Sequence, residues 1–177
     1  MTALALCKGI QGAVLAYFQS DEISIIARDD MENTTQPWVD KRLNKLLSLS
    51  AAIATAAFNE KAPSEYGQRQ FDSRAFVVPD LNEVTNYLIW RQQDATRNSI
   101  QGLGQAHFSH KQLHGKTCDA IQEMLFTEHG INWNDQPTAF KRGSCVVKEQ
   151  IAVPLESADA EPIQRSRWAI DTEIPIF

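Results

Sequence analysis

The first half of the chain alternates between apolar runs with helical spacing and short apolar runs separated by polar residues. Apolar residues recur at helical spacing over residues 3–14, which predicts a helix. Two short apolar runs follow at 13–18 and 23–27, and the polar residues between them predict a β-hairpin. Helical spacing returns over residues 38–58 in an alanine-rich segment, so we expect a second helix there.

The second half begins with a strand pattern and continues with helices. The stretch RAFVVP, at residues 74–79, predicts a strand that its proline ends. Asp80 can cap a long helix that runs to about residue 105. Ser109 or Thr117 can begin a further helix, because both are residue types that cap helix starts, and Gly130 can end it.

The order of these elements predicts the fold class. Strand patterns at 141–154 and 165–177 can pair as a final hairpin. Up to residue 79 the order is helix, strand, strand, helix, strand, and one strand in front of it would complete the βαββαβ ferredoxin-like motif. We therefore expect an α+β fold, with a ferredoxin-like domain lacking its first strand over residues 1–79 and a helical and β-hairpin region over residues 80–177.

Composition and charge narrow the class of protein without choosing a function. The 177 residues, 43% hydrophobic and 22% charged, are typical of a globular protein. No apolar stretch is long enough to span a membrane, and the first residues show no secretory signal. The three cysteines share no metal or redox spacing, which favours plain thiols in a reducing cytoplasm. The net charge of −5 argues mildly against nucleic-acid binding, although residues 91–148 hold seven Lys and Arg against five Asp and Glu.

The break between the two strands of the first hairpin carries the candidate chemistry. Asp21 and Glu22 lie there side by side. A strand end holds a carboxylate rigidly while the turn stays open to substrate, which suits Mg²⁺ with its one or two protein carboxylates. A two-ion site for phosphoryl chemistry needs another carboxylate on a neighbouring strand. The alternative is a turn aspartate that hydrogen-bonds its own backbone, and these few residues alone favour that alternative.

Two polar clusters on the predicted helices could contact an anionic partner. Arg91, Asp94, Arg97 and Asn98 fall on one face of the long helix, where they could hold phosphates and a base edge. The alternative is a solvent-exposed face with i,i+3 salt bridges. The basic cluster at 41–45 lies in the first turns of the alanine-rich helix, where cations are unfavourable to the helix dipole, so it hints weakly at an anion.

The histidines could suggest a zinc site. His107, His110 and His114 have helical spacing, but glycines interrupt the pattern and no acidic or cysteine ligand joins them locally. Exposed imidazoles, or imidazoles that face a nucleic acid, are the favoured interpretation.

Five stretches occur in order along nearly the whole chain and carry a family resemblance. They are YFQSDEIS (17–24), FDSRAFVVP (71–79), NYLIWRQQDATRNSI (86–100), FSHKQLHGK (108–116) and GINWND with PTAFKRG (130–143). Together they resemble the tRNA-His guanylyltransferase family, particularly its bacterial and archaeal "like" branch. The string at 86–100 is the most specific of the five.

The resemblance implies a polymerase-like palm domain that adds a guanylate, or templated nucleotides, to a tRNA 5′ end in the 3′-to-5′ direction. It implies GTP and ATP as substrates, two Mg²⁺ ions, a cytoplasmic location and a homo-oligomer, namely a tetramer. Ser20 and Asp21 match the motif that touches nucleotide and metal, so Asp21 is the expected catalytic metal ligand. Glu22 points to the opposite strand face in a regular strand, so we expect it to support catalysis from beside the metal. Lys45 and Asn98 are further candidates for nucleotide binding.

Two departures from the family pattern keep a second hypothesis open. The family's other metal aspartate lies in a segment that precedes the helix at which this chain begins, which implies an N-terminally truncated form. Eukaryotic members carry His-Ile-Asn-Asn where this chain has TRNS at 96–99, which favours the "like" branch that repairs tRNA 5′ ends. The alternative to an active enzyme is a catalytically inactive fragment that binds nucleotide or tRNA. For tRNA contact we favour Arg97, Lys111 and Lys116, because Arg91 has an aspartate partner three residues away.

Overall fold

The computed structural model describes residues 1–31, 34–153 and 163–177. These residues form two compact units, and each unit is described by itself. The sheet unit comprises residues 1–17, 23–77 and 145–171. The helical unit comprises residues 18–22, 78–144 and 172–177.

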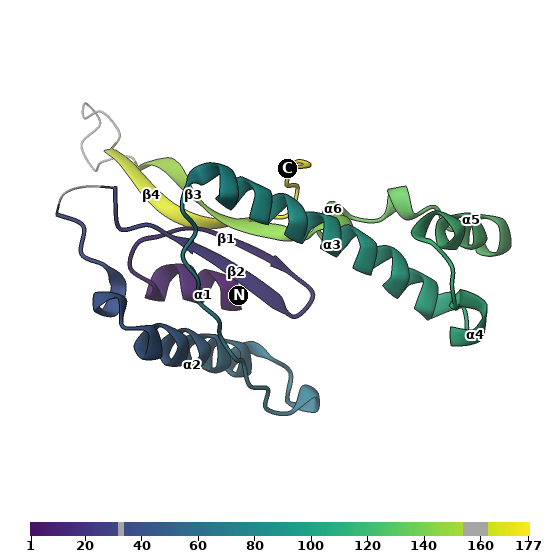
Figure 1. The fold of residues 1–177 in the computed structure, drawn as a ribbon, viewed down its shortest axis with the longest axis horizontal. Coiled ribbons are helices and arrows are strands. Elements are labelled where there is room, and N and C mark those ends of the chain that lie inside the picture. The colour runs from purple at the N-terminus through teal and green to yellow at the C-terminus, as the bar shows by residue number, and fades with distance from the viewer. Residues whose placement is uncertain (32–33, 154–162) are drawn as a thin grey trace. The chain divides into compact units, whose positions relative to one another are not determined.

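A four-stranded sheet is the framework of the sheet unit (Figure 1). Its strands are β1 (Ala13–Gln19), β2 (Glu22–Ala27), β3 (Ser144–Val153) and β4 (Ile163–Asp171), in the spatial order β2-β1-β3-β4. β3 and β4 pair antiparallel, with Cys145 opposite Asp171. The two predicted hairpins are therefore confirmed, although the last strand ends at Asp171 rather than at the C-terminus.

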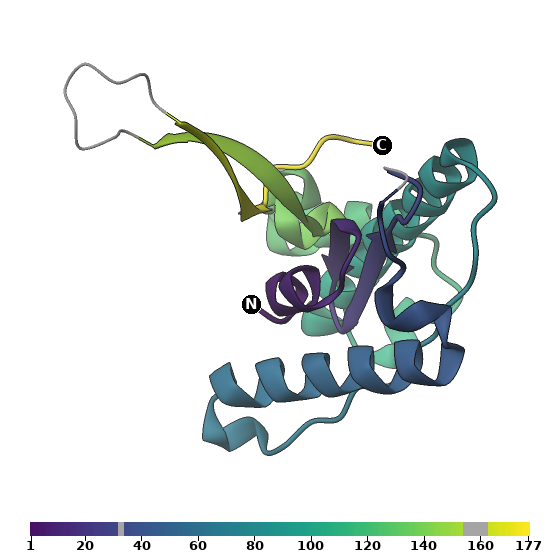
Figure 2. The same cartoon turned by 90° about the vertical axis from the view of Figure 1, so that its left-hand side faces the viewer.

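Two helices cover one face of this sheet. Helices α1 (Thr2–Gly9) and α2 (Leu43–Lys61) contact each other and lie on the same side of the strands (Figure 2). Leu6, Ile10, Ala13 and Ala54 form the buried centre of the contact, and Trp168 of β4 packs against them. The predicted first helix is shorter than its apolar spacing suggested, because the apolar residues after Gly9 belong to the strand that follows.

The second predicted helix begins later than its apolar spacing indicated. Residues Trp38–Lys41 form a separate 3-10 helix, in which the φ angles of Val39 and Asp40 are 48° and 55°. Non-glycine residues in this left-handed region cannot continue an α-helix, so α2 starts only at Leu43. Trp38 nevertheless packs against the core formed by α1, α2 and the sheet, which explains its place in the apolar pattern.

The predicted strand at 74–79 is wrong. A strand exists only where its backbone bonds to a neighbouring strand, and the sheet order includes no strand from this segment. The side chains of Phe76 and Val77 are 64% and 95% exposed, so the apolar pattern does not correspond to burial here.

The helical unit is organised along one long helix, α3 (Leu81–His107) (Figure 1). Asp80 caps it as expected, since its carboxylate accepts hydrogen bonds from the backbone N–H groups of Asn82 and Glu83. Both candidate starts downstream are used. Ser109 caps the short helix α4 (His110–Leu113), and Thr117 caps α5 (Cys118–His129), which Gly130 ends in a left-handed conformation.

Helix α5 packs against the last turns of α3. The buried centre of this contact is formed by Ile100, Phe108, Ile121 and Leu125. A further short helix, α6 (Thr138–Arg142), also contacts α3. The C-terminal residues are fastened to α3 by the Gln92 amide, which donates to the carbonyl of Pro175 and accepts from the N–H of Phe177.

The mixed helix-and-strand fold expected from the sequence is confirmed. Strands β3 and β4 pack with the N-terminal residues in the sheet unit, so the compact units do not follow the order of the chain. Among the described residues, no helix is both long and apolar enough to cross a membrane.

Candidate nucleotide-binding turn

The turn between β1 and β2 consists of Ser20 and Asp21, which join Gln19 to Glu22. Ser20 has a φ of 50°, a positive value of the kind that tight two-residue hairpin turns require at their first position. Asp21 is exposed, and its carboxylate has no hydrogen bond or ion pair with any other described residue. The turn therefore presents to solvent a hydroxyl and a carboxylate without a partner among the described residues. Both groups can bind a metal ion through oxygen.

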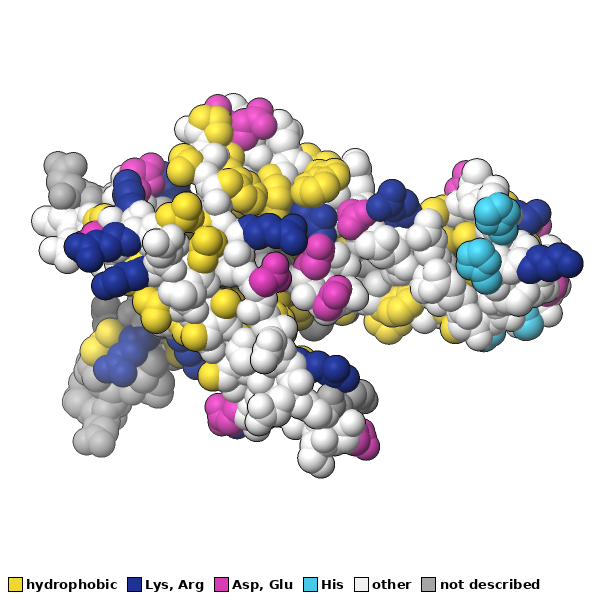
Figure 3. Space-filling model, turned by 60° about the horizontal axis from the view of Figure 1, so that its bottom comes forward, with side chains coloured by type: hydrophobic (Ala, Val, Ile, Leu, Met, Phe, Trp, Pro, Cys, Tyr) yellow, Lys and Arg dark blue, Asp and Glu magenta, His cyan; other side chains and the backbone are white. Residues whose placement is uncertain are grey.

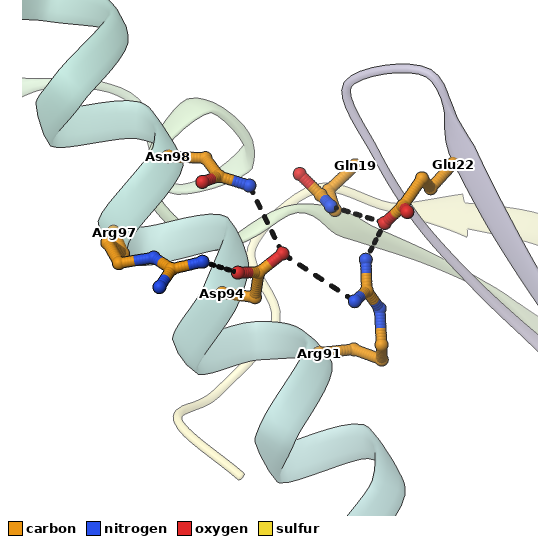
Figure 4. Close-up of polar contacts among 6 residues, drawn as sticks. All are labelled: Gln19, Glu22, Arg91, Asp94, Arg97 and Asn98. Atoms are coloured by element: carbon orange, nitrogen blue, oxygen red, sulfur yellow. Dashed lines mark hydrogen bonds and ion pairs between the residues drawn. The ribbon is translucent and has the colours of Figure 1, made fainter.

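Helix α3 supplies a line of polar side chains to this turn, within the helical unit (Figure 4). The Arg91 guanidinium forms an ion pair with the carboxylate of Glu22, which begins β2. Gln19, on the other side of the turn, donates from Nε2 to Glu22 Oε2 at 3.0 Å. The residues that flank the turn are thus joined to each other and to α3.

Asp94 holds the other end of this cluster. Its carboxylate lies 3.6 Å from Arg91 Nη1 and 2.5 Å from Arg97 Nη2, and it accepts a hydrogen bond from Asn98 Nδ2 at 3.1 Å. Arg91 is only 8% exposed, and its guanidinium also lies 4.8 Å from the ring centre of Trp90. The expectation that the polar residues at 91, 94, 97 and 98 share one helix face is confirmed.

The structure places the predicted site residues in two groups. Ser20, Asp21, Glu22 and Asn98 belong to the helical unit, where the ion pairs of Arg91 connect the turn to the helix face that carries Asn98. Lys45 belongs to the sheet unit, in the first turn of α2, and is exposed.

The three candidate tRNA-binding cations are exposed in the helical unit. Lys111 lies in α4 and Lys116 between α4 and α5, where lysine and histidine side chains gather at one end of the unit (Figure 3). Arg97 is 62% exposed although it pairs with Asp94, so it is less freely available than its sequence position suggested. His110 lies beside His114, with ring centres 6.0 Å apart. The described residues hold no group of three or more His, Cys, Asp or Glu side chains suited to a metal ion.

Two features of the helical unit were not expected from the sequence. One is the ion pair between Glu22 and Arg91, since the spacing had suggested Asp94 as the partner of Arg91. The other is a surface pocket of about 370 Å³ whose lining includes Trp133 and Arg142. The stretch GINWND with PTAFKRG contributes these two residues, and it was the only signal in the sequence that could have indicated them.

Comparisons with known proteins give a consistent result over most of the chain. A family model described as tRNAHis guanylyltransferase matches residues 1–79, and a second, described as Thg1 C terminal domain, matches residues 82–172. The tRNA(His) guanylyltransferase of Saccharomyces cerevisiae is 32% identical over 77% of this chain and 63% of its own length. A probable tRNA(His) guanylyltransferase of Dictyostelium discoideum is 26% identical over 84% of this chain and 62% of its own length.

The fold is also that of solved relatives. A bacterial tRNA(His) guanylyltransferase (Thg1)-like protein in complex with ATP has a TM-score of 0.86 and 46% identity, covering 99% of this chain and 70% of that one. A similar bacterial protein in complex with GTP has a TM-score of 0.78 and 42% identity, covering 99% of this chain and 69% of that one.

Fold and relatives together indicate a family whose members are named as guanylyltransferases, which are a kind of nucleotidyltransferase. The chain belongs to the tRNAHis guanylyltransferase family. It spans slightly less than two thirds of the length of the two curated relatives, 62% and 63%.

Proposed function

We propose that this chain carries the nucleotide- and metal-binding turn of a magnesium-dependent nucleotidyltransferase that adds guanylate, or templated nucleotides, to a tRNA 5′ end. The observation that carries the proposal is the exposed carboxylate of Asp21, which lies in the turn between two strands and has no partner among the described residues. The residues on either side of the turn are joined, since the Gln19 amide donates a hydrogen bond to the Glu22 carboxylate.

The chemistry of the turn fits Mg²⁺ as a partner. Mg²⁺ prefers oxygen ligands and is usually bound by one or two protein carboxylates, with water and phosphate oxygens completing its coordination. Asp21 would hold such an ion, and the Ser20 hydroxyl beside it would bond a phosphate oxygen of the nucleotide. A bound ion would neutralise charge that develops on the transferring phosphoryl group. No group of three metal-binding side chains forms among the described residues, so the support from this chain is for Asp21 alone.

The acceptor in this proposal is the 5′ end of a tRNA, and GTP and ATP are the nucleotides used. The similarity to bacterial relatives in complex with ATP and with GTP supports the choice of nucleotides. Addition in the 3′-to-5′ direction rests on the resemblance to the family. Exposed Lys111 and Lys116, with the histidines beside them, are the proposed contacts to the RNA backbone.

The test is the substitution Asp21→Asn, which removes a negative oxygen ligand and keeps the size of the side chain. The first measurement is the affinity of the chain for GTP in the presence and absence of Mg²⁺. The second is magnesium-dependent addition of labelled GTP to a tRNA that lacks its 5′ nucleotide. We expect the variant to lose at least about tenfold in both measurements, equivalent to about 1.4 kcal/mol.

The matched control is Asp119→Asn, which changes an exposed aspartate in the first turn of α5. This variant should behave as the unmodified chain does. Magnesium-dependent GTP affinity that survives Asp21→Asn would remove the metal role. If Asp21-dependent GTP binding occurs without any addition to tRNA, the chain binds the nucleotide without catalysing its transfer.

A further inference from the structure

Arg91 is the most deeply buried charged side chain in the cluster of Figure 4. Its side chain is 9% exposed, whereas the side chain of Arg97, six residues further along the same helix, is 62% exposed. Removing a guanidinium from water is costly unless carboxylates compensate for it. Arg91 has two of them, Glu22 from the hairpin and Asp94 from its own helix.

The position of Glu22 gives this ion pair its importance. Glu22 directly follows Asp21, so fixing its carboxylate fixes the residue next to the candidate metal ligand. Gln19, which precedes the turn, bonds to the same carboxylate oxygen that Arg91 contacts. Both ends of the turn therefore meet at the Glu22 carboxylate, which is paired with a buried guanidinium of a long, capped helix.

Asp94 contacts one terminal nitrogen of the Arg91 guanidinium, Nη1, while Glu22 contacts the other, Nη2. It lies on the helix beside Arg91 and is itself held by Arg97 Nη2 and Asn98 Nδ2. A guanidinium presents several donors in a fixed planar arrangement, so contact with Asp94 on one side orients the donor that faces Glu22.

We propose that Arg91 is a positioning residue, which fixes the backbone around Asp21 through its ion pair with Glu22. The inference rests on the proposed function in so far as Asp21 is the metal ligand to be positioned. It assigns Glu22 a different role from Asp21. The Glu22 carboxylate is committed to Arg91 and Gln19, so it anchors the turn and does not bind the metal.

The test compares Arg91→Gln and Glu22→Gln with the matched control Arg97→Gln. The control removes the other arginine bonded to Asp94 but does not touch the hairpin. Hydrogen exchange is measured on the full chain without nucleotide, in peptides covering residues 13–27 and in peptides covering α5. We expect Arg91→Gln and Glu22→Gln each to speed exchange around the turn about tenfold or more, while α5 exchanges as before. Arg97→Gln leaves Asp94 bonded to Asn98 and leaves the ion pair of Arg91 with Glu22 in place, so exchange around the turn should be unchanged.

Exchange in the ligand-free chain separates this inference from the proposed function. Faster exchange at the turn supports the positioning role of Arg91 even if Asp21→Asn leaves GTP binding intact. Unchanged exchange at the turn in Glu22→Gln overturns that role, whatever the effect of Asp21→Asn. Should Arg91→Gln fail to fold, Glu22→Gln still decides, because the Glu22 side chain is 55% exposed and its replacement leaves Asp94 beside Arg91.

A second measurement distinguishes an anchor from a metal ligand. If Glu22 acts only through Arg91, then Arg91→Gln, Glu22→Gln and the double variant should lower magnesium-dependent GTP affinity by the same factor. Arg91→Lys keeps the charge without the planar donor arrangement and should recover part of the loss. A loss confined to Glu22→Gln would make Glu22 a metal ligand and overturn the assignment.

Discussion

The packing of α5 on α3 depends on a glycine whose replacement has a calculable effect. A Cβ atom added at Gly104 would lie 2.7 Å from Cγ2 of Ile121 and 3.4 Å from Cδ2 of Leu113. Ile121 is 3% exposed and β-branched, so it cannot move aside without displacing α5. Gly104→Ala should therefore introduce an overpacking cost of about 1–3 kcal/mol.

The same helix contains a matched control, since Gly102 has no neighbouring atom within 4 Å of an added Cβ. Alanine is favoured over glycine in a helix by roughly 1 kcal/mol, and both variants share this gain. Gly102→Ala should therefore stabilise the chain by about 0.5–1 kcal/mol. The difference between the two variants isolates the contact with Ile121, which we expect to be about 1–3 kcal/mol.

The free energy of unfolding in urea gives the first measurement. Because the chain has two compact units that can unfold separately, hydrogen exchange in α5 peptides should accompany it. Exchange in α5 should be faster in Gly104→Ala than in Gly102→Ala, while exchange in α2 should be the same in both. Equal unfolding free energies for the two variants would refute the close contact between Gly104 and Ile121.

Two further predictions concern salt and pH. Affinity for tRNA should fall steeply as salt concentration rises. Alanine in place of Arg97, Lys111 or Lys116 should each reduce the slope of log affinity against log salt by about one unit. Unchanged slopes in all three variants would place the RNA surface elsewhere. Burial raises the pKa of Cys7 and of Cys145 from the ordinary 9.0 to about 11. The unfolded chain thus releases these protons first, and stability should fall as pH rises from 9 to 11. The variant with alanine at both Cys7 and Cys145 should lose less unfolding free energy over that pH range, as measured by urea unfolding. An equal loss in the variant and the unmodified chain would contradict the role of burial.

The elements that sequence predicted well are those specified by nearby residues. The long helix begins where Asp80 can cap it, and Gly130 ends α5 in a conformation that glycine favours. The hairpin around Ser20 and Asp21 follows from two strand-forming runs separated by a short polar turn. In each case the determining interaction spans only a few residues, so it is visible in the order of residue types.

The failures involve residues whose conformation depends on distant partners. RAFVVP at 74–79 is able to form a strand, but a strand also needs a neighbour, and its own sequence does not say whether one exists. Trp38 continues the apolar spacing of α2 because it shares the same core, although Val39 breaks the helix between them. Apolar spacing therefore indicates which residues are buried. It indicates a helix only where the backbone angles are helical.

The ion pair of Glu22 and Arg91 shows why the candidate site could be only half predicted. Sequence places Asp21 and Glu22 as equal neighbours, and spacing alone cannot say which of two adjacent carboxylates has a partner. The structure separates them, because Glu22 and Asp94 are balanced by Arg91 and Arg97 within one cluster. The charges of these four groups cancel, which leaves Asp21 as the uncompensated negative charge of the turn. A divalent cation would be attracted to that residue, and the neutralised cluster behind it would hold the turn in place without competing for the ion.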